Sequence, residues 1–327
     1  MRAFEYTSPT TKQQAVALLE GTWGATAVLG GGTDLLDLMK DDVETPTRLV
    51  NIKDVKELQG IRLTKSGLRI GAAVKIEELV ESPLVRHYPV VADAAREIAS
   101  PQIRHMATVG GNLCQRPRCW YYRAGFGLLA QDKDGKSLAL QGDNRYHAIL
   151  GNSGPAYFVH PSSLAPALIA CAAKIRLFGT NGEREMPLEE FYRIPASGQE
   201  RENALSPNEI VTEVLVPSLA GTKSATYEVR QKDAFDWPLA LASVVLKLSG
   251  NKVQSARVVM GYVAPTPWRS AEAEQALVGK AVTEETAQSA GNAAVDKAKD
   301  LGRNGYKIQL ARVAIKRAVL RAAKAGA

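Results

Sequence analysis

Short apolar runs alternate with segments of helical periodicity along the first third of the chain. Residues 8–21 combine a Ser/Thr cluster, apolar positions at helical spacing and a closing glycine, which predicts a capped helix. The apolar runs at 25–29 and 47–55 predict β-strands, and 67–79 predicts a strand followed by the start of a helix. Residues 84–100 again show helical spacing.

The pattern becomes less regular after residue 100. Residues 101–113 predict a second strand that runs into a pair of glycines, and a polar stretch follows at 114–152. Residues 156–179 predict, in order, a strand, a turn, a helix and a strand. A further strand is predicted from residue 209, and it ends at Pro217 because proline cannot donate to a strand ladder.

The last third has the composition of a separate unit. The segment Ser218–Ala225 is small and polar, and we place a domain boundary there. Beyond it, two β-rich runs flank Ser249–Asn251 and predict a hairpin, and alanine-rich helices follow from about Ala271. Strands that precede helices are typical of an α+β unit. We therefore expect two domains, 1–220 and 221–327.

The net charge of +7 is placed unevenly along the chain. From residue 302 onwards there are seven Lys and Arg and no acid, so the rest of the chain is balanced. A balanced surface without a recognised binding module argues against a nucleic-acid partner. The like-charged i,i+4 pairs Arg312–Lys316 and Arg317–Arg321 destabilise an isolated helix. We hypothesise that this basic face docks a partner, and we favour the alternative that solvent compensates the charges.

Hydropathy and the first residues bear on location. No apolar run approaches the ~20 residues that span a bilayer. The opening segment MRAFEYTSPTTKQQ has no apolar core of a signal peptide. We expect a soluble cytoplasmic protein, with a periplasmic location only if a partner that carries the signal is exported together with the chain.

Two glycine loops, Gly30–Leu35 and Thr108–Asn112, follow apolar strands. Because glycine has no Cβ, its backbone N–H approaches an anion closely, and a loop that begins a helix directs unpaired N–H groups at the ligand. Leu35 stands where a Rossmann fingerprint requires its third glycine or alanine, so that fingerprint fails. Two such loops in one domain predict a clamp around an extended ligand such as a dinucleotide pyrophosphate. The alternative is two unrelated turns.

The chain has three cysteines, Cys114, Cys119 and Cys171. Such a small, odd number does not indicate a disulfide framework. Cys171 lies in an apolar run, and we expect it to be a small buried hydrophobe. Cys114 and Cys119 supply only two of the about four ligands that zinc or an iron–sulfur cluster needs. The histidines show no metal spacing. We therefore expect no metal in this chain.

Four stretches stand in the order found in one family: 28–40, 94–113, 160–170 and 261–274. On these motifs the chain resembles the FAD-binding medium subunits of molybdenum hydroxylases, which include xanthine dehydrogenase, carbon monoxide dehydrogenase and bacterial aldehyde oxidoreductases. The resemblance covers almost the whole chain. It implies an α+β protein: a two-part FAD-binding domain of the vanillyl-alcohol-oxidase (PCMH) type, with a break near residue 55, and a smaller α+β C-terminal domain.

The resemblance also implies which residues contact FAD. Val28 to Leu35 would wrap the pyrophosphate, with Asp34 near the flavin end. Thr108, Gly111 and Asn112 would form the second clamp, and Val211 would pack on the isoalloxazine. The full set of implied contacts is Val28, Leu29, Gly30, Gly31, Gly32, Thr33, Asp34, Leu35, Thr108, Gly111, Asn112, Gln115, Ser162, Ser163, Val211, Glu228 and Lys232.

Two of these positions depart from the family pattern. The family often has Ser-Asp after His-Pro, and its acid bonds FAD, whereas this chain has Ser162 and Ser163. A hydroxyl replaces one hydrogen bond but not the charge. A flavin-side lysine of the family aligns with Glu228, unless Lys232 substitutes for it. These departures affect redox tuning rather than the fold.

In two branches of the family, an inserted loop carries a four-iron cluster on four cysteines. Residues 116–123 and 142–152 resemble the two ends of that loop. Cys119 matches the first ligand, Ala156 occupies the last ligand position, and 124–141 contains no cysteine. We therefore predict a loop that is retained without its four-iron cluster.

Three arginines, Arg116, Arg118 and Arg123, surround this loop's first end. They would meet cofactor phosphate or a partner, or they would form a solvated rim. We favour the rim for at least two of the three, because most charged side chains are solvated.

The resemblance implies an FAD-carrying electron-transfer subunit. Its partners would be a large subunit with the molybdenum cofactor and a small subunit with 2Fe-2S clusters, and its electrons would pass to an external acceptor. The flavin supplies the redox chemistry, so we name no catalytic residue. One alternative is a self-contained flavin oxidase of the vanillyl-alcohol-oxidase type, for which a large substrate domain is missing. Another is a non-enzymatic scaffold, against which the intact glycine loops argue.

Overall fold

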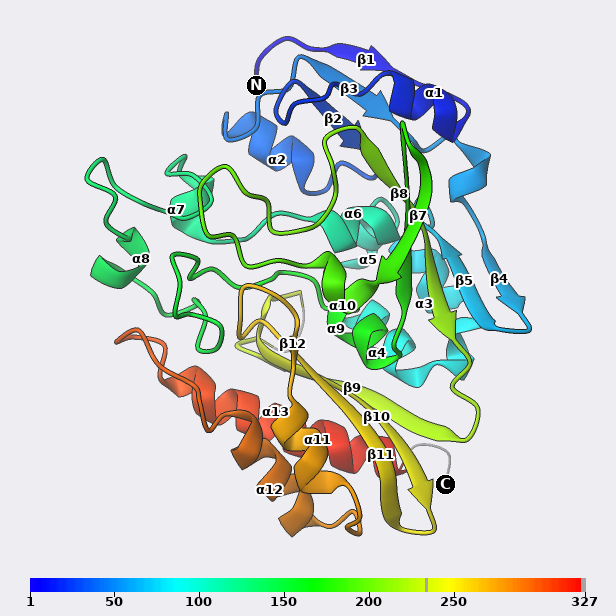
Figure 1. The fold of residues 1–327 in the computed structure, drawn as a ribbon, viewed down its shortest axis with the longest axis vertical. Helices are drawn as coiled ribbons and strands as arrows, with labels where there is room; N and C mark the ends of the chain where they lie inside the picture. Colours follow the sequence, from blue (N-terminus) through cyan, green and yellow to red (C-terminus); the bar gives the residue numbers. More distant parts are fainter. Residues whose placement is uncertain (233–234, 325–327) are drawn as a thin grey trace.

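The computed structural model describes residues 1–232 and 235–324, which form three β-sheets in chain order (Figure 1). The first is a small parallel sheet with strand order β1-β3-β2. Its strands and connecting helices are β1 (Glu5–Thr7), α1 (Lys12–Ala17), β2 (Thr26–Leu29), α2 (Leu35–Lys40) and β3 (Arg48–Asn51). The predicted first helix is confirmed, because Thr11 caps α1 by accepting a hydrogen bond from the backbone of Gln14.

The second sheet is antiparallel, with strand order β4-β5-β8-β6-β7. Its strands are β4 (Ile61–Thr64), β5 (Gly67–Gly71), β6 (Lys174–Gly179), β7 (Gly182–Pro187) and β8 (Glu209–Pro217). The alternation along β5, β6 and β8 places Ile70, Ile175 and Val214 in the largest core cluster. Cys171, only 2% exposed, lies in the same cluster, as its apolar run predicts.

Short helices lie between the strands of this second sheet. They are η1 (Lys56–Leu58), α3 (Ile76–Glu81), η2 (Val85–His87), α4 (Pro89–Glu97), α5 (Pro101–Arg104), α6 (Val109–Cys114), α7 (Trp120–Arg123), α8 (Leu138–Gln141), α9 (Leu164–Ala170) and α10 (Leu188–Phe191). Buried residues of α4 and α9 join the core cluster of the sheet. The apolar residues of these two helices therefore fill the space beneath the sheet.

Two strand predictions are wrong. The residues before the second glycine loop form helix α5 and one isolated bridge, between Lys75 and Thr108, instead of the strand predicted from residue 101. Residues 156–160 were expected to form a strand, but they run outside every sheet. Their backbone is paired in another way, because the amide of Ala148 donates to Tyr157 at 2.8 Å and the amide of His160 donates to Ala264 at 2.9 Å. Hydrogen bonds to two different loops therefore satisfy the backbone polar groups of this extended segment without a strand ladder.

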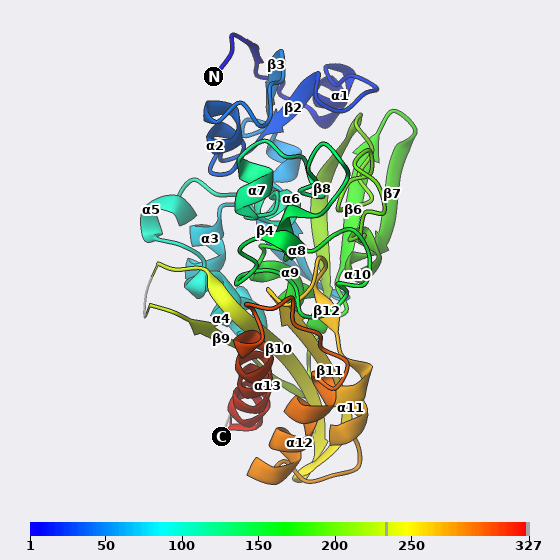
Figure 2. The same cartoon turned by 90° about the vertical axis from the view of Figure 1, so that its left-hand side faces the viewer.

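The third sheet is antiparallel, with order β12-β11-β10-β9, and three helices lie against it (Figure 2). Its elements are β9 (Thr222–Arg230), β10 (Pro238–Ser249), β11 (Lys252–Gly261), β12 (Trp268–Arg269), α11 (Ala271–Leu277), α12 (Glu284–Ala294) and α13 (Tyr306–Lys324). Gly250, at φ +58°, makes the predicted β10–β11 turn. Strands followed by helices confirm the α+β class.

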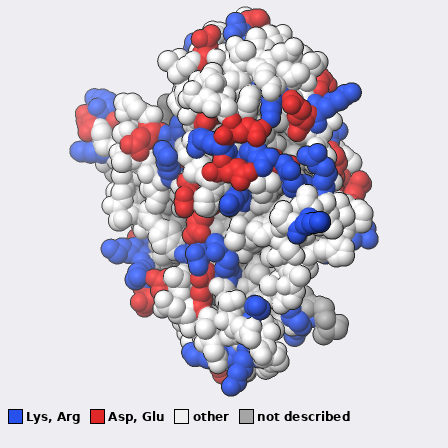
Figure 3. All heavy atoms as spheres, turned by 45° about the vertical axis from the view of Figure 1, so that its right-hand side comes forward, with Lys and Arg blue, Asp and Glu red and all other residues white. Residues whose placement is uncertain are grey.

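The basic face of α13 finds partners within the chain. Lys316 pairs with Glu284 at 2.6 Å, and Arg321 pairs with Asp93 at 3.3 Å. An internal acid therefore compensates one member of each like-charged pair, as the favoured alternative needs, and docking of a partner at this face stays a hypothesis. On the face drawn in Figure 3, Lys and Arg intermingle with Asp and Glu. Within the described ranges, no helix is both long and apolar enough to cross a bilayer.

Lys307 is the exception among the C-terminal cations, because its residue is only 1% exposed. Its Nζ donates to the carbonyl oxygens of Tyr146 at 3.1 Å, His147 at 3.0 Å and Tyr262 at 2.7 Å. These bonds engage all three ammonium hydrogens. Burial lowers the pKa of Lys307 to about 7. The side chain tethers the polar stretch 114–152 to the C-terminal unit.

Replacing this tether tests its contribution to stability. In Lys307→Met, three buried carbonyls lose a charged donor, so we expect the free energy of unfolding to fall by about 3 kcal/mol. Urea denaturation measures the change. Lys324→Met, at the exposed end of the same helix, is the matched control and should stay within about 0.5 kcal/mol of wild type. Equal losses in both variants would contradict the tether.

Candidate functional site

The two glycine loops pack directly against each other. A Cβ on Gly31 would lie 1.8 Å from the carbonyl oxygen of Met106, and a Cβ on Gly30 would lie 2.7 Å from Oγ1 of Thr108. Both distances are too short for any side chain, so the loops meet because these positions are glycine. Thr108 also caps α6 by accepting a hydrogen bond from the amide of Gly111 at 3.2 Å.

Two cavities open beside this contact. The loop cavity has a volume of about 190 Å³, and the interdomain cavity has a volume of about 480 Å³. Of the predicted contacts, Val28, Gly30, Gly31, Gly32, Thr33, Asp34, Leu35, Thr108, Gly111 and Gln115 line the loop cavity. Those that line the interdomain cavity are Thr33, Asp34, Gly111, Asn112, Gln115 and Ser163. Since four residues line both, the cavities adjoin at the glycine loops.

The other five predicted contacts line neither cavity. Leu29 is buried in β2, and Val211 lies in β8 within the largest core cluster. Ser162 donates to Oδ1 of Asn112 at 2.6 Å and so braces the second glycine loop from behind. Lys232 is exposed, and Glu228 is buried in β9.

The loop cavity has a wall that the sequence did not predict. The guanidinium of Arg201 lies 4.3 Å from the ring centroid of Trp23, and both residues line this cavity. Nε of Arg201 is buried without a hydrogen-bond partner among the described residues, and the nearest acid, Glu44, is 3.8 Å away. A flat wall beside a cation with a free N–H fits a planar ring that carries a phosphate nearby. No motif surrounds either residue, so only the folded chain identifies them.

Backbone strain gathers at the interdomain cavity. Ala99, Phe235 and Tyr262 have φ of +46°, +57° and +63°, and all three line it. Such angles cost about 1–3 kcal/mol each in residues other than glycine, and they persist mostly at functional sites. Ala99 and Tyr262 belong to stretches on which the family resemblance rests, but no single-residue pattern marks them.

Asp34 holds the arginine-rich segment against the first glycine loop. Its carboxylate accepts from Arg123 at 2.6 Å and from the backbone amide of Arg116 at 2.8 Å, and Arg118 lies 3.4 Å away. The predicted solvated rim is wrong: Arg116 is 8% exposed and the side chain of Arg123 is 15% exposed. Both side chains turn inward because they pair with acids there, including Glu202, which lies 2.7 Å from Arg116.

The retained loop is filled by apolar side chains. Cys119 and Ala156, the first and last ligand positions of the family's cluster loop, meet Leu128 and Leu129 in one hydrophobic cluster. Across the described ranges, no group of three or more His, Cys, Asp or Glu could hold a metal ion. Both positions therefore lie in an apolar cluster with these leucines.

Glu228 is a buried carboxyl beside Ser163 of the interdomain cavity. Its side chain is 2% exposed, and neither oxygen has a hydrogen-bond partner among the described residues. Burial raises the pKa of Glu228 to about 8, and the nearby Ser163 hydroxyl offsets only part of that shift. Nε of Arg230 is 3.3 Å away, but that guanidinium also pairs with Glu97. Glu228 is therefore a neutral acid at pH 7, where the family pattern has a cation.

This shift makes stability depend on pH. The carboxyl of Glu228 ionises near pH 4.5 in the unfolded chain but stays protonated to about pH 8 in the folded chain. The stability that the protonated carboxyl contributes to the fold is fully present below pH 4.5 and is lost as the pH rises to 8. Glu228→Gln should therefore match wild type near pH 4.5 and exceed its stability at pH 8.5 by several kcal/mol, since one pKa unit corresponds to ~1.4 kcal/mol.

Urea unfolding at the two pH values measures this effect. Glu81→Gln, at an exposed position of α3, is the control and should follow wild type throughout. A Glu228→Gln profile parallel to wild type would show that the carboxyl is ionised in the folded protein.

Comparisons with known proteins agree with this geometry. Residues 2–219 match the family model of the FAD binding domain in molybdopterin dehydrogenase. Residues 225–322 match the CO dehydrogenase flavoprotein C-terminal domain. The two matches cover almost the whole chain.

Individual relatives give the same result. The chain is 34% identical to the aldehyde oxidoreductase FAD-binding subunit PaoB of Escherichia coli over 281 residues, 85% of this chain and 86% of that protein. It is 32% identical to the carbon monoxide dehydrogenase medium chain of Hydrogenophaga pseudoflava over 322 residues, 97% and 96% of the two chains.

A solved structure extends this likeness to the fold. A chain of the carbon monoxide dehydrogenase from Hydrogenophaga pseudoflava superposes with a TM-score of 0.77 at 31% identity, covering 98% of this chain and 97% of that one. The predicted resemblance and fold class are confirmed. The chain therefore belongs to the FAD-binding medium subunits of the molybdenum hydroxylases, the family of carbon monoxide, aldehyde and xanthine dehydrogenase subunits.

Proposed function

We propose that this oxidoreductase subunit takes electrons from iron–sulfur clusters of a partner and passes them to an external acceptor through its FAD. The observation that carries the proposal is the direct contact of two glycine loops, at which two cavities adjoin. An extended dinucleotide needs such an arrangement, because its pyrophosphate must cross a narrow backbone surface while its two ring systems lie on opposite sides.

The described residues fit FAD in detail. Gly30–Gly32 and Thr108 would hold the pyrophosphate, since their backbone is open to an anion on the cavity side. The stacked Trp23 and Arg201 would hold the adenine, and the interdomain cavity would hold the isoalloxazine. FAD supplies two-electron redox chemistry when bound. The chain's own residues bind it, orient it and set its electrostatic surroundings.

Two polar groups near the interdomain cavity would shape those surroundings. Glu228 contributes a neutral carboxyl rather than the lysine of the family pattern. Asp34, which lines the cavity, is paired with Arg123, so its charge is compensated within the chain. The remaining implied contacts, Leu29, Ser162 and Val211, would act by supporting the lining residues from behind.

The partners follow from the same reasoning. On this proposal, the FAD receives electrons from a small subunit with 2Fe-2S clusters, which takes them from a large subunit with the molybdenum cofactor. We infer a cytoplasmic complex of these three chains. We also retain the division into an FAD-binding domain at 1–220, with a break near residue 55, and a C-terminal domain at 221–327.

FAD should bind without a covalent bond, one per chain, because neither glycine loop contains His or Cys. Gly111→Val should weaken binding at least hundredfold, since a Cβ there lies 2.9 Å from Oγ1 of Thr108 and in the shared wall of both cavities. Titration calorimetry with FAD measures the affinity, and acid precipitation should leave the flavin in the supernatant.

Gly198→Val is the matched control, because a Cβ at that exposed glycine meets nothing within 4 Å. It should bind FAD as wild type does. Yellow colour in the acid pellet, or wild-type affinity in Gly111→Val, would contradict this site.

The isolated chain should be inactive. Purified alone with FAD, it should contain no stoichiometric iron and should not turn over aldehydes or purines. Co-expression with the small and large subunits should give one complex on size-exclusion chromatography, with iron and turnover. Turnover of a small substrate by the isolated chain would instead identify a self-contained flavin oxidase. Iron with acid-labile sulfide in the isolated chain would contradict the apolar filling of the loop.

A further inference from the structure

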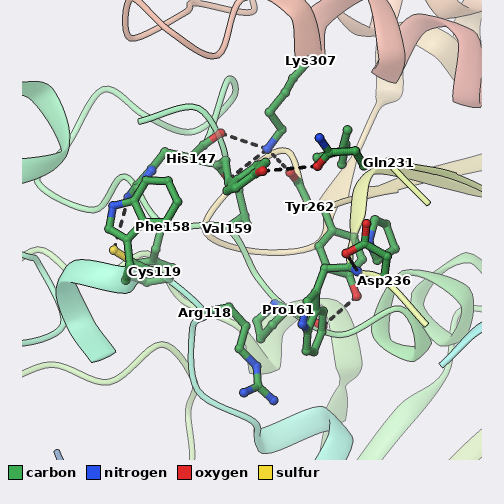
Figure 4. A pocket seen from close by; sticks show the side chains of 15 residues that line it. Arg118, Cys119, His147, Phe158, Val159, Pro161, Gln231, Asp236, Tyr262 and Lys307 are labelled. Carbon is green, nitrogen blue, oxygen red and sulfur yellow. Dashed lines mark hydrogen bonds between the residues drawn. The ribbon is translucent and has the colours of Figure 1, made fainter. Parts of the chain in front are cut away.

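A third cavity of about 200 Å³ lies between the retained loop and the C-terminal unit, beside the proposed FAD site (Figure 4). We term it the aromatic cavity. Six aromatic residues line it: Trp120, Tyr146, His147, Phe158, Trp237 and Tyr262. Figure 4 shows Lys307 at one end and Arg118 at the other, with Val159 and Pro161 between them.

One layer of side chains separates this cavity from the interdomain cavity. Arg118, Trp237 and Tyr262 line both. The guanidinium of Arg118 lies 4.7 Å from the ring centroid of Trp237, so the two stack. Arg118 is directed toward Asp34, away from the aromatic cavity. A molecule in the aromatic cavity would therefore be within one side chain of the proposed flavin position.

Two cations line the aromatic cavity, and one of them, Arg118, lies 3.4 Å from Asp34, although its Nε has no hydrogen-bond partner among the described residues. Lys307 uses all three hydrogens on backbone carbonyls. Burial and the Lys307 charge lower the pKa of His147 to about 4, so this ring is neutral at pH 7. Its Nε2 lies 3.2 Å from Sγ of Cys119, whose pKa is raised by burial, so the thiol is neutral as well. Asp236 adds a negative charge to the wall. A phosphate group would therefore find neither a free ammonium nor an imidazolium among these lining residues.

The volume of the aromatic cavity further limits which ligands it can hold. An apolar cavity of about 150 Å³ holds a benzene ring. The aromatic cavity is somewhat larger and has rings on its sides, which favour a planar guest through stacked or edge-to-face contacts. It is too small for a dinucleotide. It suits one substituted ring.

We propose that the aromatic cavity binds a small uncharged quinone ring and is the site of the electron acceptor. The proposal rests on the proposed function for its redox part. The quinone takes two electrons and two protons from the reduced flavin, so its two C=O groups become C–OH groups and the flavin returns to its oxidised state. Atoms and charge balance without a further reactant.

The test uses duroquinone with the full-length, FAD-loaded chain. All ring carbons of this quinone are substituted, so it does not add to Cys119. Val159→Trp and Leu239→Trp each fill the cavity. Two variants are used so that the test still works if one of them fails to fold. Val278→Trp, at a position 46% exposed and outside all three cavities, is the control. Duroquinone binding is measured by calorimetry, and reoxidation of the dithionite-reduced chain is followed by stopped flow.

We expect saturable binding that falls at least tenfold in both filled variants and is unchanged in Val278→Trp. Reoxidation by duroquinone should slow by a similar factor in the filled variants, while reoxidation by ferricyanide, an anion too highly charged for the cavity, should not change. Equal duroquinone rates in filled and control variants would overturn the proposal. So would competition between duroquinone and FAD for the apoprotein.

Two further outcomes distinguish failure of this proposal from failure of the proposed function. If the chain binds no FAD, yet duroquinone binding is still lost on filling the cavity, the ring site stands and the flavin function fails. If durene, the redox-inert analogue, binds while duroquinone reoxidises the flavin at the same rate in every variant, the cavity takes an aromatic ring but is no acceptor site, and the proposal is overturned.

Discussion

The site depends on the contact between the two glycine loops. At Gly31 the backbone approaches the carbonyl of Met106 so closely that a Cβ would stand 1.8 Å from the oxygen. This approach joins the small parallel sheet, which carries Gly31 after β2, to the segment that leads into helix α6, whose N-cap is Thr108. Without it, the two cavities would not adjoin, and no single extended ligand could contact both loops.

Electrostatics and apolar packing fix the segment that follows. Asp34, on the first glycine loop, binds the segment that begins at Arg116, and Lys307 binds its other end from the C-terminal helix. Between these anchors, Leu128 and Leu129 pack on Cys119 and Ala156. The segment is therefore held by charge-assisted hydrogen bonds near its ends and by dispersion at its centre.

Much of this was accessible from the sequence, because the relevant signals are local. The glycine pairs predicted both loops, although a helix and not a strand precedes the second loop. The Ser249–Asn251 turn predicted the hairpin. The prediction of a solvated Arg116–Arg123 segment is wrong, because the position of this segment depends on Asp34, about eighty residues away in the sequence. Trp23 and Arg201 were missed for the same reason. Long-range charge pairing has no periodicity, so no window of the sequence reveals it.

The central claim is that one FAD crosses the contact between the glycine loops, with its rings in different cavities. A crystal structure of the chain with FAD tests this most directly. The account predicts pyrophosphate density against Gly30–Gly32 and Gly111, with adenine at Trp23 and isoalloxazine in the interdomain cavity. Density for both ring systems on one side of the loops, or pyrophosphate bound away from Gly31, would contradict it.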